Sequence, residues 1–174
     1  MKKGIFIFSL TLILFTVNVV KGNAQEAKFK ATFTLNFIRY IGWPESTKQG
    51  DFVIGVLKAK EIADYMTSQS AGKKFGFQDV VIKDFKNTDE ITDCQVLFVS
   101  SYANFSRHAS EILAKVGKNT LVVCESEGAT DSGAAINFVI RDSKLKFEIK
   151  KANAAKAGLQ ISSKLESMAS AINL

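Results

Sequence analysis

Residues that could carry out catalysis are few in this 174-residue chain, and they form no recognised constellation. His108 is the only histidine, and a lone histidine within a helical segment is more often a surface residue than a catalyst. One histidine and two separated cysteines, Cys94 and Cys124, give no metal-ligand spacing. The chain also lacks a Gly-x-Ser-x-Gly elbow, a phosphate loop and a dinucleotide fingerprint. We therefore expect no catalytic residue, no metal, no cofactor and no enzymatic activity.

Two polar segments have the character of binding sites. Ser100 and Ser101 leave an apolar strand and open a helical segment, where free backbone N–H groups can hold an anion. A serine in this position can instead simply cap the helix. The polar loop that runs from Glu125 through Glu127 to Gly133 is long, and such loops on a rigid sheet often carry function, although it can equally be a plain connection.

The elements that must position these residues alternate between helix and strand. A first helix over residues 26–41 is predicted by apolar side chains at every fourth position, Phe29, Phe33, Phe37 and Ile41, and Trp43-Pro44 ends it. Apolar runs predict strands over 52–57, 80–85, 95–100 and 120–124, and helical spacing predicts helices over 61–70 and 102–116. A hairpin follows over 136–140 and 145–149, and then a long C-terminal helix over 153–172.

This alternation predicts an α/β fold with a mainly parallel sheet flanked by helices and of flavodoxin-like character. The C-terminal antiparallel hairpin and the long C-terminal helix complete it. Such folds bind ligands beyond the carboxyl ends of the parallel strands. These ends are expected at Leu57-Lys58, Ser100-Ser101 and Cys124-Glu125.

The two cysteines are predicted not to pair with each other. Cys94 lies at the amino end of its strand, and Cys124 closes the neighbouring strand at the carboxyl end. Parallel strands would then separate them by about 16 Å, whereas a disulfide needs Cα atoms within about 7 Å. Both are expected to be buried, small apolar side chains. A redox-responsive thiol or an intermolecular link is the alternative.

The N-terminus has the features of an export signal. Lys2 and Lys3 precede an apolar run over residues 5–20, and Gly22-Asn23-Ala24 places small residues where a signal peptidase cleaves. The run is shorter than the ~20 residues of a comfortable membrane span. We therefore expect cleavage before Gln25 rather than a retained anchor, with residues 1–24 as the signal peptide and 25–174 as a single α/β domain.

Removal of the signal also removes Lys2, Lys3 and Lys21, which lowers the formal net charge from +6 to +3. That charge is too mild and too evenly spread to indicate a nucleic-acid partner.

Several segments, in order along the chain, resemble the YfiR family. The C-terminal segments are 135–139 (AINFV), 147–149 (FEI) and 157–165 (AGLQISSKL), and the upstream ones are 37–44, 54–57 and 94–100. Together they cover nearly all of the chain after the signal. The resemblance implies a non-enzymatic periplasmic regulator that binds and represses the periplasmic domain of a membrane diguanylate cyclase, and so controls cyclic di-GMP. It also allows a homodimer and a small-molecule signal.

The resembling segments contain further candidate residues. Ser162, Ser163 and Lys164 are expected on or beside the exposed face of the last helix, where they could contact a partner or hydrogen-bond within the fold. Asn137 lies within a strand, where asparagine is disfavoured, and is expected to hold a neighbouring loop rather than a ligand. A second function stays open, that of a periplasmic small-molecule sensor or scavenger associated with a receptor or transporter.

Overall fold

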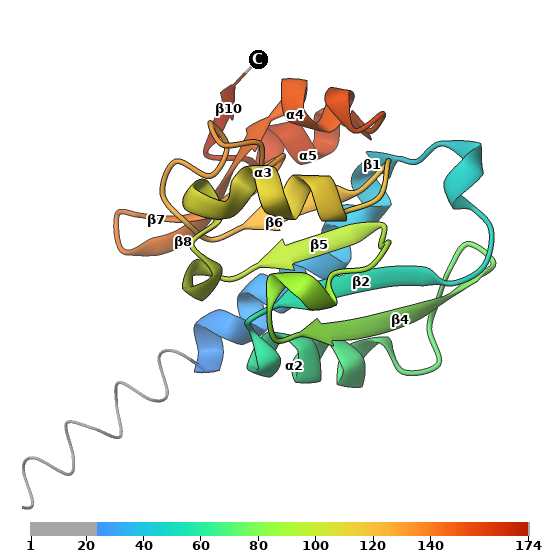
Figure 1. Ribbon diagram of the computed structural model, residues 1–174. Coiled ribbons are helices and arrows are strands. Elements are labelled where there is room, and N and C mark those ends of the chain that lie inside the picture. Colours follow the sequence, from blue (N-terminus) through green and yellow to red (C-terminus); the bar gives the residue numbers. More distant parts are fainter. Residues whose placement is uncertain (1–23, 174) are drawn as a thin grey trace, which may run out of the picture.

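A single large sheet forms the centre of the computed structural model, which describes residues 24–173 (Figure 1). The predicted signal peptide, apart from Ala24, lies outside the described residues. The strands of the sheet are β2 (Phe52–Leu57), β3 (Lys74–Phe75), β4 (Gln78–Phe85), β5 (Val96–Val99), β6 (Leu121–Cys124), β7 (Ile136–Arg141), β8 (Lys144–Lys150) and β10 (Ala171–Asn173). Their order is β10-β8-β7-β6-β5-β2-β4-β3. Two short strands, β1 (Ile41–Gly42) and β9 (Gln160–Ile161), pair separately.

The sheet is mixed. Strands β4, β2, β5, β6 and β7 run parallel to one another. Strands β3 and β8 are antiparallel to their neighbours β4 and β7, and β10 is parallel to β8, so three strands oppose the other five. The fold is therefore a mixed α/β fold, and the predicted flavodoxin-like, mainly parallel character is not confirmed. The β7–β8 hairpin forms as predicted, with Phe138 opposite Phe147.

Both faces of the central strands are buried, which explains why their sequences are apolar throughout rather than alternating. In β5, Val96 and Phe98 pack into one core, and Leu97 and Val99 pack into the other. The first core lies under the N-terminal helix (residues 24–37) and α2 (Lys60–Ser70). The second lies under α3 (Phe105–Lys115).

The predicted burial of the N-terminal helix is wrong at two positions. Phe37 is buried, but Phe29 is 49% exposed and Phe33 is 39% exposed. The helix instead presents Ala31 and Thr34 to the core. Residues spaced by four turn about 40° further around a helix at each step, because one turn takes 3.6 residues. Two steps before Phe37, the Phe29 side chain has therefore rotated away from the core. Phe33, one step before Phe37, stays at the edge of the core, with its ring centre 6.2 Å from that of Phe147.

The C-terminal segment is not one long helix. It contains α4 (Lys151–Lys156), β9, α5 (Ser163–Met168) and β10. Gly158 interrupts the predicted helix, since its φ of +74° is a left-handed conformation that glycine adopts without strain. Ser162 then starts the next helix, because its side chain accepts a hydrogen bond from the Leu165 N–H.

Short 3-10 turns complete the fold. They are η1 (Ile38–Tyr40), η2 (Glu45–Thr47), η3 (Thr88–Glu90) and η4 (Ser101–Ala103). The predicted helix over 102–116 is thus divided into η4 and α3 by Asn104, whose φ is +50°. Among residues 24–173, no helix has the length and apolar composition of a membrane span.

Candidate functional site

The carboxyl ends of β2, β5 and β6 meet at one edge of the sheet, where ligands bind in folds of this kind. After β2 the chain leads to β4 on one side, and after β5 it leads to β6 on the other, so the strand order reverses between β2 and β5. Lys58 follows β2, Ser100 and Ser101 follow β5, and Glu125 follows β6. The fold therefore brings together three of the predicted candidates, Ser100, Ser101 and Glu125.

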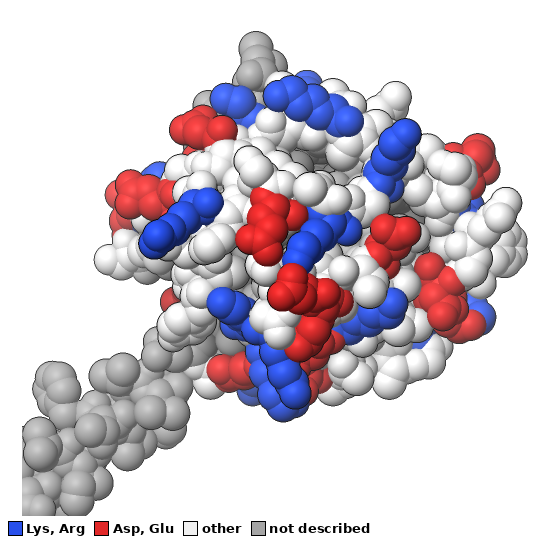
Figure 2. Space-filling view, viewed as in Figure 1, with Lys and Arg blue, Asp and Glu red and all other residues white. Residues whose placement is uncertain are grey.

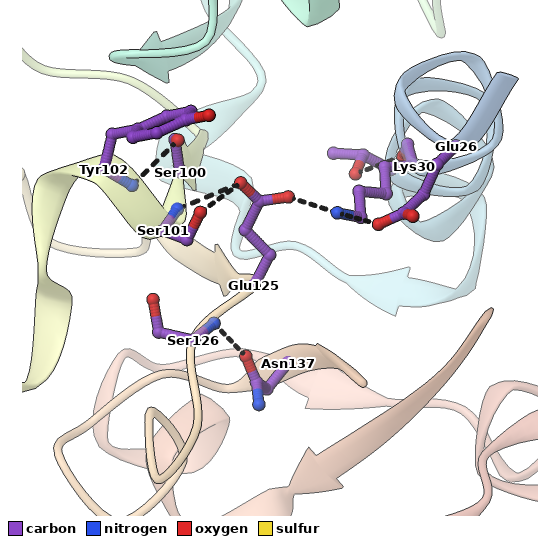
Figure 3. Close-up of polar contacts among 9 residues, drawn as sticks. Glu26, Lys30, Ser100, Ser101, Tyr102, Glu125, Ser126 and Asn137 are labelled. Carbon is purple, nitrogen blue, oxygen red and sulfur yellow. Dashed lines mark hydrogen bonds and ion pairs between the residues drawn. The ribbon is translucent and has the colours of Figure 1, made fainter. Parts of the chain in front are cut away.

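A network of polar contacts joins these loops to the N-terminal helix (Figure 3). Oε1 of Glu125 accepts hydrogen bonds from the backbone N–H of Ser101 at 2.9 Å and from Ser101 Oγ at 3.3 Å. Its Oε2 accepts one from Lys30 Nζ at 2.5 Å. Lys30 also pairs with Glu26, one turn earlier on the helix, at 2.6 Å. Two loops and one helix are thus connected through a single carboxylate.

The ion pair is largely shielded from solvent. The side chain of Lys30 is 14% exposed and that of Glu125 is 10% exposed. Burial acts to lower the pKa of the Lys30 ammonium, but the hydrogen bonds and charges of Glu125 and Glu26 outweigh it, so the pKa is raised above 10.5. Lys30 therefore carries its charge at neutral pH. Elsewhere, on the face seen in Figure 2, basic and acidic side chains are interspersed.

The predicted anion position is occupied by the chain's own carboxylate. Ser100 is buried, and its Oγ accepts a hydrogen bond from the Tyr102 N–H at 3.2 Å, so it caps the following turn, as the alternative to anion binding predicted. The Ser101 N–H, which could have held an external anion, donates to Glu125 instead. An incoming anion would have to displace this carboxylate.

Two hollows lie on either side of the network. The first, of about 360 Å³, lies between the strands where the order reverses, and its lining includes Lys58, Ser101 and Tyr102. The second, of about 540 Å³, lies towards the β7–β8 hairpin, and its lining includes Glu127 and Arg141. Glu26, Lys30 and Glu125 line both hollows. The arrangement can bind and orient polar groups, but it presents no nucleophile paired with a base among the described residues.

Asn137 holds the neighbouring loop, as predicted. It is fully buried in β7, and its Oδ1 accepts a hydrogen bond from the Ser126 N–H at 3.1 Å. Its Nδ2 donates to Glu148 Oε1 at 3.4 Å. The side chain therefore fixes the backbone next to Glu125, which positions that carboxylate.

The Ser162–Lys164 segment lies elsewhere, at the start of α5. Ser162 caps this helix and also donates its backbone N–H to the Tyr40 carbonyl at 2.9 Å. Ser163 and Lys164 are exposed, and Lys164 Nζ lies 5.6 Å from the centre of the Tyr40 ring. Ser162 is thus a structural residue, while the other two are accessible to a partner.

Cys94 and Cys124 are both buried and both free thiols. Their strands β5 and β6 are parallel neighbours, with Cys124 opposite Val99 at the end far from Cys94. Burial raises the pKa of the Cys94 thiol to about 12 and that of Cys124 well above its usual value. The absence of a disulfide in the protein in solution remains a prediction.

Sequence reasoning missed Lys30 and Glu26. Their i, i+4 spacing on a predicted helix was the available signal, because residues so spaced lie on the same face. Nothing local indicates the partner of Lys30, since Glu125 is 95 residues away in the chain.

The family model described as YfiR/HmsC-like matches residues 27–170. No curated protein matches the chain. Among solved structures, a conserved domain protein from Vibrio cholerae matches with a TM-score of 0.54 and 9% identity, over 84% of this chain and 60% of that chain. A proposed NADP oxidoreductase from Bacteroides fragilis matches with a TM-score of 0.38 and 10% identity, over 71% and 59%. At this identity the Vibrio structure indicates a shared fold alone, and the chain spans less than two thirds of its length.

Proposed function

The chain belongs to the YfiR/HmsC-like family, and we propose from this membership that it is a periplasmic regulatory protein that represses a membrane diguanylate cyclase. In this proposal the mature protein binds the periplasmic domain of the cyclase and so lowers cyclic di-GMP on the other side of the membrane. Members of this family are regulators rather than known enzymes.

The observation that carries the proposal is the extent of the family match. It covers residues 27–170, which run from within the N-terminal helix past the end of α5. The export signal predicted over residues 1–24 supports a location where such a regulator acts.

The proposal is tested in the native host. Deletion of the gene should raise cyclic di-GMP, and expression of the full chain from a plasmid should restore the original level. Crosslinking in intact cells should recover a membrane protein with a periplasmic domain. The intact mass of the purified regulator should correspond to a chain that begins at Gln25. Unchanged cyclic di-GMP together with no crosslinked membrane protein would refute the repressor role.

A second candidate function is a periplasmic small-molecule sensor or scavenger. The hollow of about 360 Å³ at the reversal of strand order favours it, because such positions bind ligands in related folds. Native mass spectrometry of protein purified from the periplasm would test it. A bound molecule that Tyr102→Ala and Lys58→Ala both release would support this function.

A further inference from the structure

A groove whose charged lining residues are all basic lies away from the Glu125 network. It runs between the N-terminal helix, the end of α2 and the β3–β4 hairpin, and has a volume of about 290 Å³. Its apolar floor consists of Leu35, Ile38, Phe75 and Val80. Ile38 is buried and the other three side chains are half-buried, so the floor remains accessible.

The charged residues that line the groove are all basic. They are Arg39, Lys73 and Lys74, each exposed, and none of the described lining residues is acidic. Lys74 pairs with Asp79 at 2.7 Å. None of the ion pairs among the described residues involves Arg39 or Lys73. Two cations are therefore available to an acidic partner beside an apolar floor.

The size of the groove favours a protein segment over a small organic ligand. Pockets that enclose small molecules usually have roughly 300–1,000 Å³ and bury most of the ligand. This groove, at about 290 Å³, is just below that range and is open to solvent. It has room for an apolar side chain from a docked segment, whose neighbouring carboxylates would then reach Arg39 and Lys73 at the rim. Basic clusters recognise acidic motifs in this way.

We propose that this groove docks an acidic segment of the partner protein, with one apolar side chain on the floor and carboxylates against Arg39 and Lys73. The inference rests on the proposed function, because it assumes a protein partner and adds the chemistry by which that partner is held. Charge complementarity between the groove and the acidic segment would raise the association rate of the two proteins. It would also make their affinity decrease with salt concentration.

A zero-length carbodiimide reagent provides the test, since it joins a lysine amine to a carboxylate in direct contact. The purified mature protein is mixed with membranes from the deletion strain, and crosslinked peptides are identified by mass spectrometry. We expect a peptide containing Lys73 or Lys74 joined to an Asp or Glu of a membrane protein. The double variant Lys73→Arg/Lys74→Arg keeps the charge but lacks the amines, so it should bind normally and lose this crosslink.

Charge-reversal variants measure how much the basic residues of the groove contribute to binding of the membrane partner. Arg39→Glu and Lys73→Glu should each weaken association roughly tenfold or more, and Lys118→Glu, an exposed lysine outside the groove, should not. Circular dichroism and thermal unfolding confirm that each variant is folded. A partner that binds all variants equally overturns the groove proposal and leaves the repressor proposal intact. Crosslinks only between two copies of this chain, or a small molecule that Arg39→Glu releases, also overturn it. No membrane partner for the wild type overturns both proposals.

Discussion

Lys30 and Glu125 form an ion pair of 2.5 Å between residues that are 95 positions apart in the sequence. One lies on the N-terminal helix and the other on the loop after β6, and both side chains are largely buried. Because Glu125 also accepts the Ser101 N–H, a single carboxylate fixes the helix to two loops at the carboxyl edge of the sheet. This contact leads to the first two predictions.

Removal of the Glu125 charge should destabilise the protein. Glu125→Ala leaves the buried Lys30 with only Glu26 as its partner and leaves the Ser101 N–H without its acceptor. The expected loss is about 2–4 kcal/mol of unfolding free energy. Glu125→Gln retains an acceptor for Ser101 and should lose less. Urea denaturation measures both variants.

The control for this prediction is the Lys60–Asp64 pair, whose side chains are 73% and 63% exposed. Asp64→Ala should cost far less than Glu125→Ala, because exposed ion pairs contribute little to stability. Equal losses for Glu125→Ala and Asp64→Ala would contradict the structural role of the buried pair.

The Lys30 ion pair should also give stability a dependence on alkaline pH. The pKa of Lys30 is raised above 10.5 in the folded protein, mainly because its two carboxylate partners outweigh the effect of burial. A group with a raised folded pKa contributes stability that is fully present below the unfolded pKa and is lost as pH rises through the folded pKa. Unfolding free energy should therefore fall from about pH 10 upward.

Lys30→Arg provides the comparison, because a guanidinium does not titrate in this range. Between pH 10 and 12, the unfolding free energy should fall less steeply in Lys30→Arg than in the wild type. From pH 7 to 9, it should depend on pH in the same way in both proteins. Identical slopes in the two proteins would mean that other groups cause the alkaline loss.

Asn137→Ala should loosen the loop that carries Glu125. The change removes the acceptor of the Ser126 N–H. The lost side chain is fully buried in the wild type. We expect a loss of about 1–3 kcal/mol and faster amide hydrogen exchange at residues 125–128. Ser162→Ala, which removes a cap in α5, should cost about 1 kcal/mol without faster exchange in that loop.

The cysteines should react only when the protein unfolds. Both thiols are buried, and the pKa of Cys94 is raised to about 12, so little reactive thiolate exists at pH 8. Labelling of the native protein should be slow, and labelling of the oxidised, denatured monomer should show two free thiols. A crosslinked peptide pair joining Cys94 and Cys124 would contradict the separation of the two residues along β5 and β6.

The C-terminus shows where local patterns were insufficient. The apolar stripe over 153–172 fits a helix, but Gly158 has a φ of +74° and its position packs against Asn119. Gly158→Ala should therefore destabilise the protein by about 1–2 kcal/mol rather than join α4 and α5. Circular dichroism would show whether helix content stays constant, as we expect.

The sequence by itself determined the elements whose patterns are local. The continuous apolar runs of β2, β5 and β6 predicted strands covered on both faces, and the alternation in β8 predicted the hairpin with β7. The order of helices and strands was sufficient to predict an α/β fold and to place Ser100, Ser101 and Glu125 at one edge of the sheet. Backbone conformation and burial dictate these patterns residue by residue, so they are visible in the chain.

Only the tertiary structure decided which residues contact one another across that edge. The sequence could not indicate that Lys30 meets Glu125 or that this carboxylate takes the Ser101 N–H. Each outcome depends on the angle at which the N-terminal helix lies on the sheet, which the packing of the whole core sets. A contact between residues 95 apart is a property of that packing and leaves no periodic signal in the chain.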